Sequence, residues 1–333
     1  MDRKDIKKGL ELLSGISKSK KVKCAAAGAG VVAGILTGAY AAYKYVFHFI
    51  DKRDENDIML PKGEQYDPMH EKMYSLVREM QEIPYEQVYI TSFDGTKLAG
   101  KYYHISDEAP LQIQFHGYHG TGLRDFCGGH KIAREMGHNI LVIDERAHGK
   151  SEGKYVGFGV LDRYDLLEWI RYVNKRFDNG RKIFLFGTSM GATTVLMASG
   201  FKEVQDCVKG IIADCAFTSP NDIFSHVLKK DYHLPPFPIM NINNVMCKKT
   251  AGYTFTEYST LDALKTNKIP VLFIHGKEDK FVPTWMSEKN YEAAVCEKEL
   301  LMVDGAGHGS SCYENMSLYQ ETEKKFISKC LGQ

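Results

Sequence analysis

The sequence predicts an α/β protein with a mostly parallel, doubly wound sheet. After Pro84, short apolar runs rich in Val, Ile, Leu and Phe alternate with longer segments of helical periodicity. This alternation is typical of strands in a largely parallel sheet that helices cover on both faces. Hydrophobic residues make up 44% of the 333 residues and charged residues 26%. This composition is typical of a packed globular protein and excludes a disordered or fibrous chain.

Two antiparallel strands open the predicted sheet, because residues 85–92 and 96–105 flank the turn-forming sequence Phe-Asp-Gly at 93–95. The apolar runs that follow predict strands at 111–115, 139–144, 182–187, 210–215, 269–276 and 299–304. The segments between them predict helices at about 124–136, 160–177, 190–200, 222–230, 284–296 and 312–329. Together these elements form one predicted domain over residues 86–333.

The N-terminal part of the chain differs from this domain in its charge. Residues 1–23 have a net charge of +5 and the remainder has a net charge of −4. Residues 24–43 contain no charged side chain, and a 20-residue helix is about 30 Å long, the thickness of a bilayer core. We therefore predict a basic cytoplasmic leader at 1–23, a single transmembrane helix at 24–43, and a linker with a short helix at 44–85. The excess of positive charge before the helix places the main domain outside the cytoplasm, at the cell membrane.

Two alternatives for the apolar segment stay open. The small residues Ala39 and Ala41 allow a signal peptide that is cleaved near Ala41, which would give a secreted protein. The segment would otherwise be a buried apolar helix of the domain. If it spans a membrane, Gly30, Gly34 and Gly38 lie on one face, and this face predicts a homodimer.

A serine at a strand end has the surroundings of a nucleophile. The strand predicted at 182–187 runs into Gly-Thr-Ser-Met-Gly at 187–191 and then into a helix. In this G-x-S-x-G pattern the glycines permit a sharp turn that exposes Ser189 at the helix N-terminus, where negative charge is stabilised. A second match around Ser151 starts beyond its strand and leads into Gly-rich sequence. Its context excludes it.

A serine nucleophile needs a base and an acid that orients the base. Strand 269–276 is followed by Asp279, and strand 299–304 is followed by His308. Parallel strands bring such residues to one edge of the sheet. Asp214 also ends a strand, and Glu278 is adjacent to Asp279, so each is an alternative acid.

With these residues, the chain from 86 to 329 resembles the α/β-hydrolase-fold serine hydrolases. It is most similar to bacterial membrane-anchored or exported members related to the prolyl oligopeptidase-like and serine aminopeptidase-like groups. Two runs are typical of them: D-x-R-x-H-G-x-S at 144–151 and H-G-x-x-D-x-x-V-P at 275–283. The order Ser189, Asp279, His308 is also that of the α/β-hydrolases.

The resemblance implies a role for each site residue. Ser189 attacks the substrate, His308 transfers the proton, and Asp279 orients His308, since Asp279 occupies the acid position of the motif. The backbone N–H groups of Tyr118 and Met190 form the oxyanion hole.

A small cap over the site is predicted at 216–262. The strands on either side of this segment are separated by about twice the length that one crossover helix needs, and Pro235, Pro236 and Pro238 exclude a single helix. Apolar side chains of this segment would face an acyl or alkyl group of the substrate. The candidates are Phe237, Ile239, Met240 and Val245.

The predicted function is a serine hydrolase that cleaves a carboxylic ester through an acyl-serine intermediate. Its partners are a small-molecule or peptide acyl substrate and the membrane. One alternative is a serine peptidase or aminopeptidase-like hydrolase, and another is a non-catalytic, membrane-anchored binding protein on the same fold. We expect no cofactor and no metal, because no His, Asp or Glu cluster has metal-ligand spacing. We expect no nucleic acid partner, because the net charge is only +1.

Overall fold

The computed structural model describes residues 37–51, 53, 58, 60–177 and 180–333, and an eight-stranded sheet lies at their centre. In chain order the strands are β1 (Glu86–Thr91), β2 (Lys97–Tyr103), β3 (Leu111–Phe115), β4 (Asn139–Asp144), β5 (Ile183–Thr188), β6 (Val208–Asp214), β7 (Val271–Gly276) and β8 (Lys298–Val303). In space they follow the order β1-β2-β4-β3-β5-β6-β7-β8. The pairs β1–β2 and β2–β4 are antiparallel, and all later pairs are parallel. The predicted mostly parallel sheet with an antiparallel start is confirmed.

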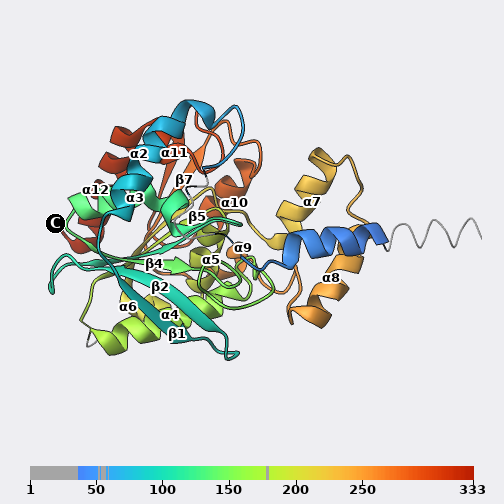
Figure 1. Ribbon diagram of the computed structural model, residues 1–333, viewed down its shortest axis with the longest axis horizontal. Helices are drawn as coiled ribbons and strands as arrows, with labels where there is room; N and C mark the ends of the chain where they lie inside the picture. The colour runs from blue at the N-terminus through green and yellow to red at the C-terminus, as the bar shows by residue number, and fades with distance from the viewer. Residues whose placement is uncertain (1–36, 52, 54–57, 59, 178–179) are drawn as a thin grey trace, which may run out of the picture.

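Helices cover both faces of this sheet (Figure 1). One face carries α2 (His70–Gln81), α3 (Gly122–Glu135), α11 (Ser311–Glu314) and α12 (Met316–Leu331). The other carries α4 (Asp162–Arg176), α5 (Met190–Ala198), α6 (Lys202–Cys207), α9 (Thr260–Leu264) and α10 (Trp285–Ala293). A 3₁₀ turn, η1 (Asp67–Met69), precedes α2. Strands β3 and β7 are buried along their whole length, as strands between two helical layers should be.

The segment between β6 and β7 makes the largest excursion from the sheet. It contains α7 (Pro220–Lys230) and α8 (Ile239–Thr250), which stand beside the domain with the blue helix of residues 37–47 between them (Figure 1). Helix α8 begins directly after Pro238, because a proline fixes the backbone at a helix start but lacks an N–H for the helix interior. We refer to α7, α8 and their connection, residues 220–250, as the cap.

Residues 37–47 form a helix that packs against the cap. Tyr43 and Phe47, one turn apart, are buried, and the Phe47 ring lies 5.0 Å from that of Phe255 and 4.9 Å from that of Phe224. Among the residues that the structure describes, no helix is long and apolar enough to cross a bilayer.

The outcome for the predicted transmembrane helix at 24–43 follows from this packing. Residues 24–36, and with them Gly30 and Gly34, lie outside the described residues. Residues 37–43 are described, and they belong to the helix on the cap, with Gly38 and Ala41 lining a groove against it. The predicted end of the span at residue 43 is therefore not supported, because the apolar side chains there contact protein.

Candidate active site

Ser189 occupies a strained turn between β5 and α5. Its backbone has φ +55° and ψ −111°, a conformation that non-glycine residues rarely adopt. A Cβ atom on Gly187 would lie 2.3 Å from the backbone of Gly191, and one on Gly191 would lie 1.8 Å from the carbonyl oxygen of Phe115. Only glycine fits at both positions, so the local sequence produces the sharp turn on which Ser189 is presented.

His308 lies after β8 and joins Ser189 to Asp279. The Ser189 hydroxyl lies 2.9 Å from His308 Nε2, and His308 Nδ1 lies 2.7 Å from Asp279 Oδ2. A carboxylate only accepts hydrogen bonds, so Nδ1 carries the proton and Nε2 is free to accept the serine proton. The three residues predicted from the strand ends thus come together in one hydrogen-bonded array.

The Asp279 carboxylate contacts two backbone N–H groups and a second histidine. Its Oδ1 accepts hydrogen bonds from the N–H groups of Phe281 (2.8 Å) and Val282 (2.9 Å), and its Oδ2 is also 3.2 Å from Nε2 of His275. Burial opposes the charge of this carboxylate, but His308 and His275 outweigh the burial and hold the pKa of Asp279 far below its usual range. Asp279 is therefore ionised at neutral pH, and His275 is a contact that the sequence motif did not predict.

The alternative residues lie elsewhere. The Asp214 carboxylate accepts hydrogen bonds from Ser311 (3.3 Å) and Tyr319 (3.2 Å), and burial raises its pKa. Glu278 is exposed. Ser151 is buried, where its hydroxyl donates to the carbonyl oxygen of Asp144 and accepts from the N–H of Ala99. None of the three joins the array of Ser189, His308 and Asp279.

Residues 116–120, which follow β3, form a loop beside Ser189. A Cβ atom on Gly117 would lie 3.4 Å from Cβ of Ser189. On one side of Tyr118, the N–H of Gly117 donates to Asp125 Oδ2 (2.7 Å), and on the other side the N–H of His119 donates to His148 Nε2 (3.1 Å). These bonds fix the loop around the Tyr118 amide, one of the two predicted oxyanion donors. Met190, the other, is the first residue of α5, where N–H groups have no acceptor within the helix.

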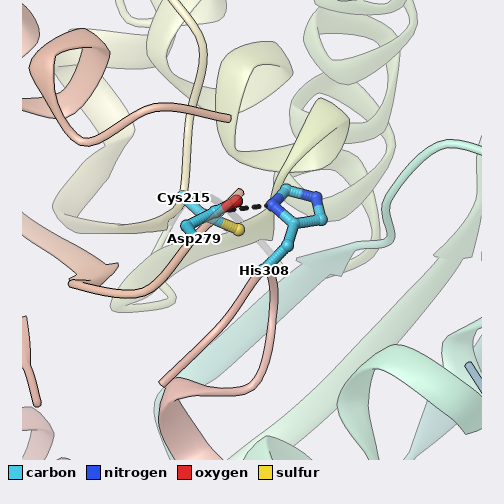
Figure 2. Close-up of side chains that lie close together, drawn as sticks. All are labelled: Cys215, Asp279 and His308. Atoms are coloured by element: carbon cyan, nitrogen blue, oxygen red, sulfur yellow. Dashed lines mark hydrogen bonds and ion pairs between the residues drawn. The ribbon is translucent and has the colours of Figure 1, made fainter. Parts of the chain in front are cut away.

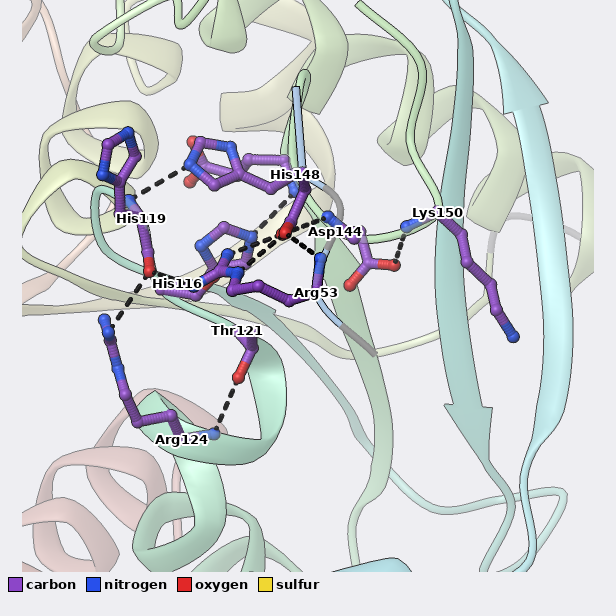
Figure 3. A network of polar contacts seen from close by, with 12 residues as sticks. Arg53, His116, His119, Thr121, Arg124, Asp144, His148 and Lys150 are labelled. Carbon is purple, nitrogen blue, oxygen red and sulfur yellow. Dashed lines mark hydrogen bonds and ion pairs between the residues drawn. The ribbon is translucent and has the colours of Figure 1, made fainter. Parts of the chain in front are cut away.

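A strap from the N-terminal segment, formed by residues 49–51 and 53, lies over this loop (Figure 3). The Arg53 guanidinium donates to the carbonyl oxygens of His119 (2.7 Å) and Gly120 (3.1 Å). Asp51 accepts from Arg53 and from the N–H of Gly149 (3.0 Å), and the Phe49 ring stacks on His119 with 4.0 Å between centroids. No motif in the sequence indicates this role, because a lone arginine that binds backbone carbonyls has no recognisable pattern.

We expect Arg53→Ala to lower kcat about ten- to a hundredfold with little change in KM or melting temperature. Loss of the guanidinium frees two carbonyls of loop 116–120, and small displacements of a positioning loop cost rate rather than binding. Steady-state kinetics on a short ester measure this. Arg171→Ala is the control. The ion pairs described for Arg171, with Glu168 and Glu203, are exposed and lie on α4 and α6 rather than on loop 116–120. An Arg53→Ala protein with wild-type kcat would contradict the positioning role.

The group Cys215, Asp279 and His308 has metal-ligand residue types within reach of one another (Figure 2). Their contacts do not fit a metal centre. Oδ2 of Asp279 is engaged by two histidines. Burial raises the pKa of Cys215 far above its usual range, so it stays a thiol rather than the thiolate that binds metals.

The four predicted cap residues divide into two pairs. Ile239 and Met240 line an apolar groove between the cap and residues 37–47. Phe237 and Val245 do not, and 73% and 56% of their surfaces are exposed, so for these two the prediction was wrong. Phe237 precedes the start of α8, and Val245 lies on the helix face opposite Met240.

The pH dependence of the site is set by His308. Burial lowers its pKa, but the charge and hydrogen bond of Asp279 outweigh burial and raise the pKa above the ordinary 6.5. Only neutral His308 accepts the Ser189 proton, so we expect kcat/KM to fall as the pH drops through a value above 6.5. A profile from about pH 5 to about pH 9 measures this, and an acid limb below 6.5 would contradict it.

Comparison with known proteins places this geometry in a family. The model of the Peptidase_S9, or prolyl oligopeptidase, family matches residues 153–333, which contain Ser189, Asp279 and His308. The chain belongs to the prolyl oligopeptidase family. With its sheet and its serine turn, it is an α/β-hydrolase-fold serine hydrolase, as the motifs predicted.

Similar curated proteins match most of the chain. Protein YqkD of Bacillus subtilis is 28% identical over 304 residues, which cover 91% of this chain and 95% of YqkD. The alpha/beta hydrolase domain-containing protein WAV2 of Arabidopsis thaliana is 23% identical over 267 residues, covering 78% of this chain and 83% of WAV2.

Solved structures share the fold. The Pyrococcus furiosus esterase Pf2001 superposes with a TM-score of 0.61 at 20% identity, covering 81% of this chain and 97% of the esterase. Est1E of Butyrivibrio proteoclasticus, solved with ferulic acid bound, superposes with a TM-score of 0.57 at 20% identity, covering 74% of this chain and all of Est1E.

Proposed function

We propose that this member of the family is a carboxylic ester hydrolase in which Ser189 is the nucleophile, His308 the general base and acid, and Asp279 the residue that orients His308. The observation that carries the proposal is the continuous pair of hydrogen bonds from Ser189 through His308 to Asp279. His308 takes the proton as Ser189 attacks the ester carbonyl, and then gives it to the leaving alcohol. Water then takes the place of the alcohol. His308 takes a proton from the water as it attacks the acyl-serine, and gives the proton to the Ser189 oxygen when the acid leaves.

The negative charge of the tetrahedral intermediate would be stabilised by the N–H groups of Tyr118 and Met190. Both lie beside Ser189, one on loop 116–120 and one at the N-terminus of α5, where the helix dipole adds to the effect.

The family name and the site suggest a peptidase as the second candidate. An aminopeptidase needs a carboxylate to hold the substrate's ammonium group. Among the described residues that line the pocket at Ser189, the carboxylate is Asp125, and it is already bound to Arg124 and to the N–H of Gly117. This favours an ester without a charged amino terminus, in agreement with the esterase Pf2001 among the structures of the same fold.

The proposal is tested with a fluorophosphonate probe and two substrate series. We expect the probe to label the wild-type protein and not Ser189→Ala. p-Nitrophenyl esters should be cleaved faster than aminoacyl amides. Labelling with faster amide cleavage would support the peptidase, and absence of labelling would support a non-catalytic protein.

We propose separately that the domain lies outside the cytoplasm and that the N-terminal segment attaches it to the membrane. It rests on the charge difference between residues 1–23 and the rest of the chain.

A further inference from the structure

A cavity larger than the pocket at Ser189 lies between the cap and residues 37–47. The pocket at Ser189 has a volume of about 230 Å³, whereas a groove between the cap and residues 37–47 has a volume of about 850 Å³. A volume of this size is typical of sites that enclose a small-molecule ligand.

The lining of the groove is almost entirely apolar. The helix 37–47 supplies small residues on one side, among them Ala41 and Ala42, and the cap supplies larger ones such as Leu228 and Ile239 on the other. Small residues on one wall leave the space open, and aliphatic residues on the other make it suitable for a hydrocarbon. The rim adds exposed apolar side chains, including Tyr45, Tyr232 and Leu234.

One polar side chain in this wall has an unpaired atom. Asn243 on α8 lines the groove and is only 6% exposed, and its Oδ1 has no hydrogen-bond partner among the described residues. The Oδ1 atom itself has almost no accessible surface, so it does not point into the groove, and the groove presents no unpaired acceptor there to a ligand.

Tyr118 connects the groove to Ser189. It lines the pocket at Ser189, and its hydroxyl donates to the carbonyl oxygen of Val46 (3.0 Å), a residue that lines the groove. Its ring also lies 5.2 Å from that of Phe158, which in turn packs on Phe47 in the groove wall. The side chain of Tyr118 therefore lines the pocket at Ser189 and contacts residues that line the groove.

We propose that the groove binds the hydrocarbon chain of the ester substrate, with the ester at Ser189 and the chain passing Tyr118 into the space between helix 37–47 and the cap. The inference rests on the proposed ester hydrolase function. In this inference, helix 37–47 forms one wall of the substrate site. The substrate class is thus an ester of a long-chain acid or alcohol.

The first arm of the test is a series of p-nitrophenyl esters from acetate upward. For the wild-type protein kcat/KM should rise with each added methylene, by up to about fourfold per group, until the groove is full. Ala42→Trp fills the groove from the helical wall, so it should lower the ratio of kcat/KM for long-chain esters to kcat/KM for acetate about tenfold or more. Val245→Trp adds the same ring to the exposed face of α8 and should leave this ratio unchanged.

The second arm measures binding without turnover. Full-length Ser189→Ala should bind a fluorescent long-chain fatty acid, and Ala42→Trp in that background should weaken binding about tenfold or more, whereas Val245→Trp should not. Asn243→Leu, which makes this part of the groove wall apolar at nearly the same size, should bind the probe at least as tightly as the Ser189→Ala parent, and clearly weaker binding would contradict a hydrocarbon site.

The outcomes separate the two proposals. If acetate is cleaved but the chain-length profile is flat and the fatty acid does not bind, the chain site is wrong and the ester hydrolase stands. If the fatty acid binds but no ester is cleaved, the hydrolase proposal fails instead. If the wild-type protein is a dimer that Ala42→Trp dissociates, the groove is an interface between copies and the chain site is overturned.

Discussion

Ser189→Ala is expected to lower kcat by three or more orders of magnitude while substrate binding survives. The hydroxyl is the only group of the array that forms the bond to the substrate carbonyl, and removal of a serine nucleophile in comparable arrays has effects of this size. Turnover of p-nitrophenyl acetate, with protein concentration fixed by absorbance, measures the loss.

Ser151→Ala is the matched control, because Ser151 belongs to the other G-x-S-x-G sequence in the chain. Its hydroxyl bonds only to the backbone of Asp144 and Ala99, so we expect near wild-type turnover and a loss of about 1 kcal/mol in the free energy of unfolding. An inactive Ser151→Ala beside an active Ser189→Ala would reverse the assignment.

Asp279→Asn is expected to lower kcat by up to about 10⁴-fold, through the tautomer of His308. Two backbone N–H groups fix the Oδ1 position, so an asparagine keeps its carbonyl oxygen there and turns its NH₂ group toward His308 Nδ1. Nδ1 must then accept a hydrogen bond, which puts the imidazole proton on Nε2, facing Ser189. In that state His308 cannot take the serine proton.

Asp214→Asn and Glu278→Gln are the controls for this change. The partners of Asp214 are two hydroxyls, of which one can donate to the amide oxygen of asparagine and the other can accept from its NH₂ group, and Glu278 is exposed. Both variants should keep turnover within a few-fold of wild type. If Asp214→Asn were the inactive variant, the acid would act from the end of β6 and the assignment of Asp279 would be wrong.

The residues of the array could be found from the sequence because each one follows a strand. Strands β5, β7 and β8 have recognisable apolar runs, and the carboxyl ends of parallel strands meet at one edge. The turn at Ser189 is also local, since its glycines are two residues away on either side. Such features depend on short segments, which the sequence displays directly.

What the sequence could not reveal depends on contacts between distant segments. Residues 37–43 have the composition of a membrane span, but composition does not say whether an apolar helix face contacts lipid or protein. The deciding fact is that Phe47 packs on the rings of Phe224 and Phe255, which lie about 180 and about 210 residues later in the chain. The prediction for Phe237 was wrong for a similar reason. The direction of its side chain depends on where α8 begins, at Ile239, and the sequence alone does not show that position.

The strap and the helix before it also have a mechanical consequence. Helix 37–47 packs against the cap. Phe49 and Arg53, which follow this helix in the chain, contact the loop beside Ser189. The two attachments are in series, so a force applied at residue 37 reaches the groove wall first and the loop second. The smallest autonomous enzyme therefore starts upstream of β1, and truncation at residue 86 would remove part of the machinery while leaving all three residues of the array in place.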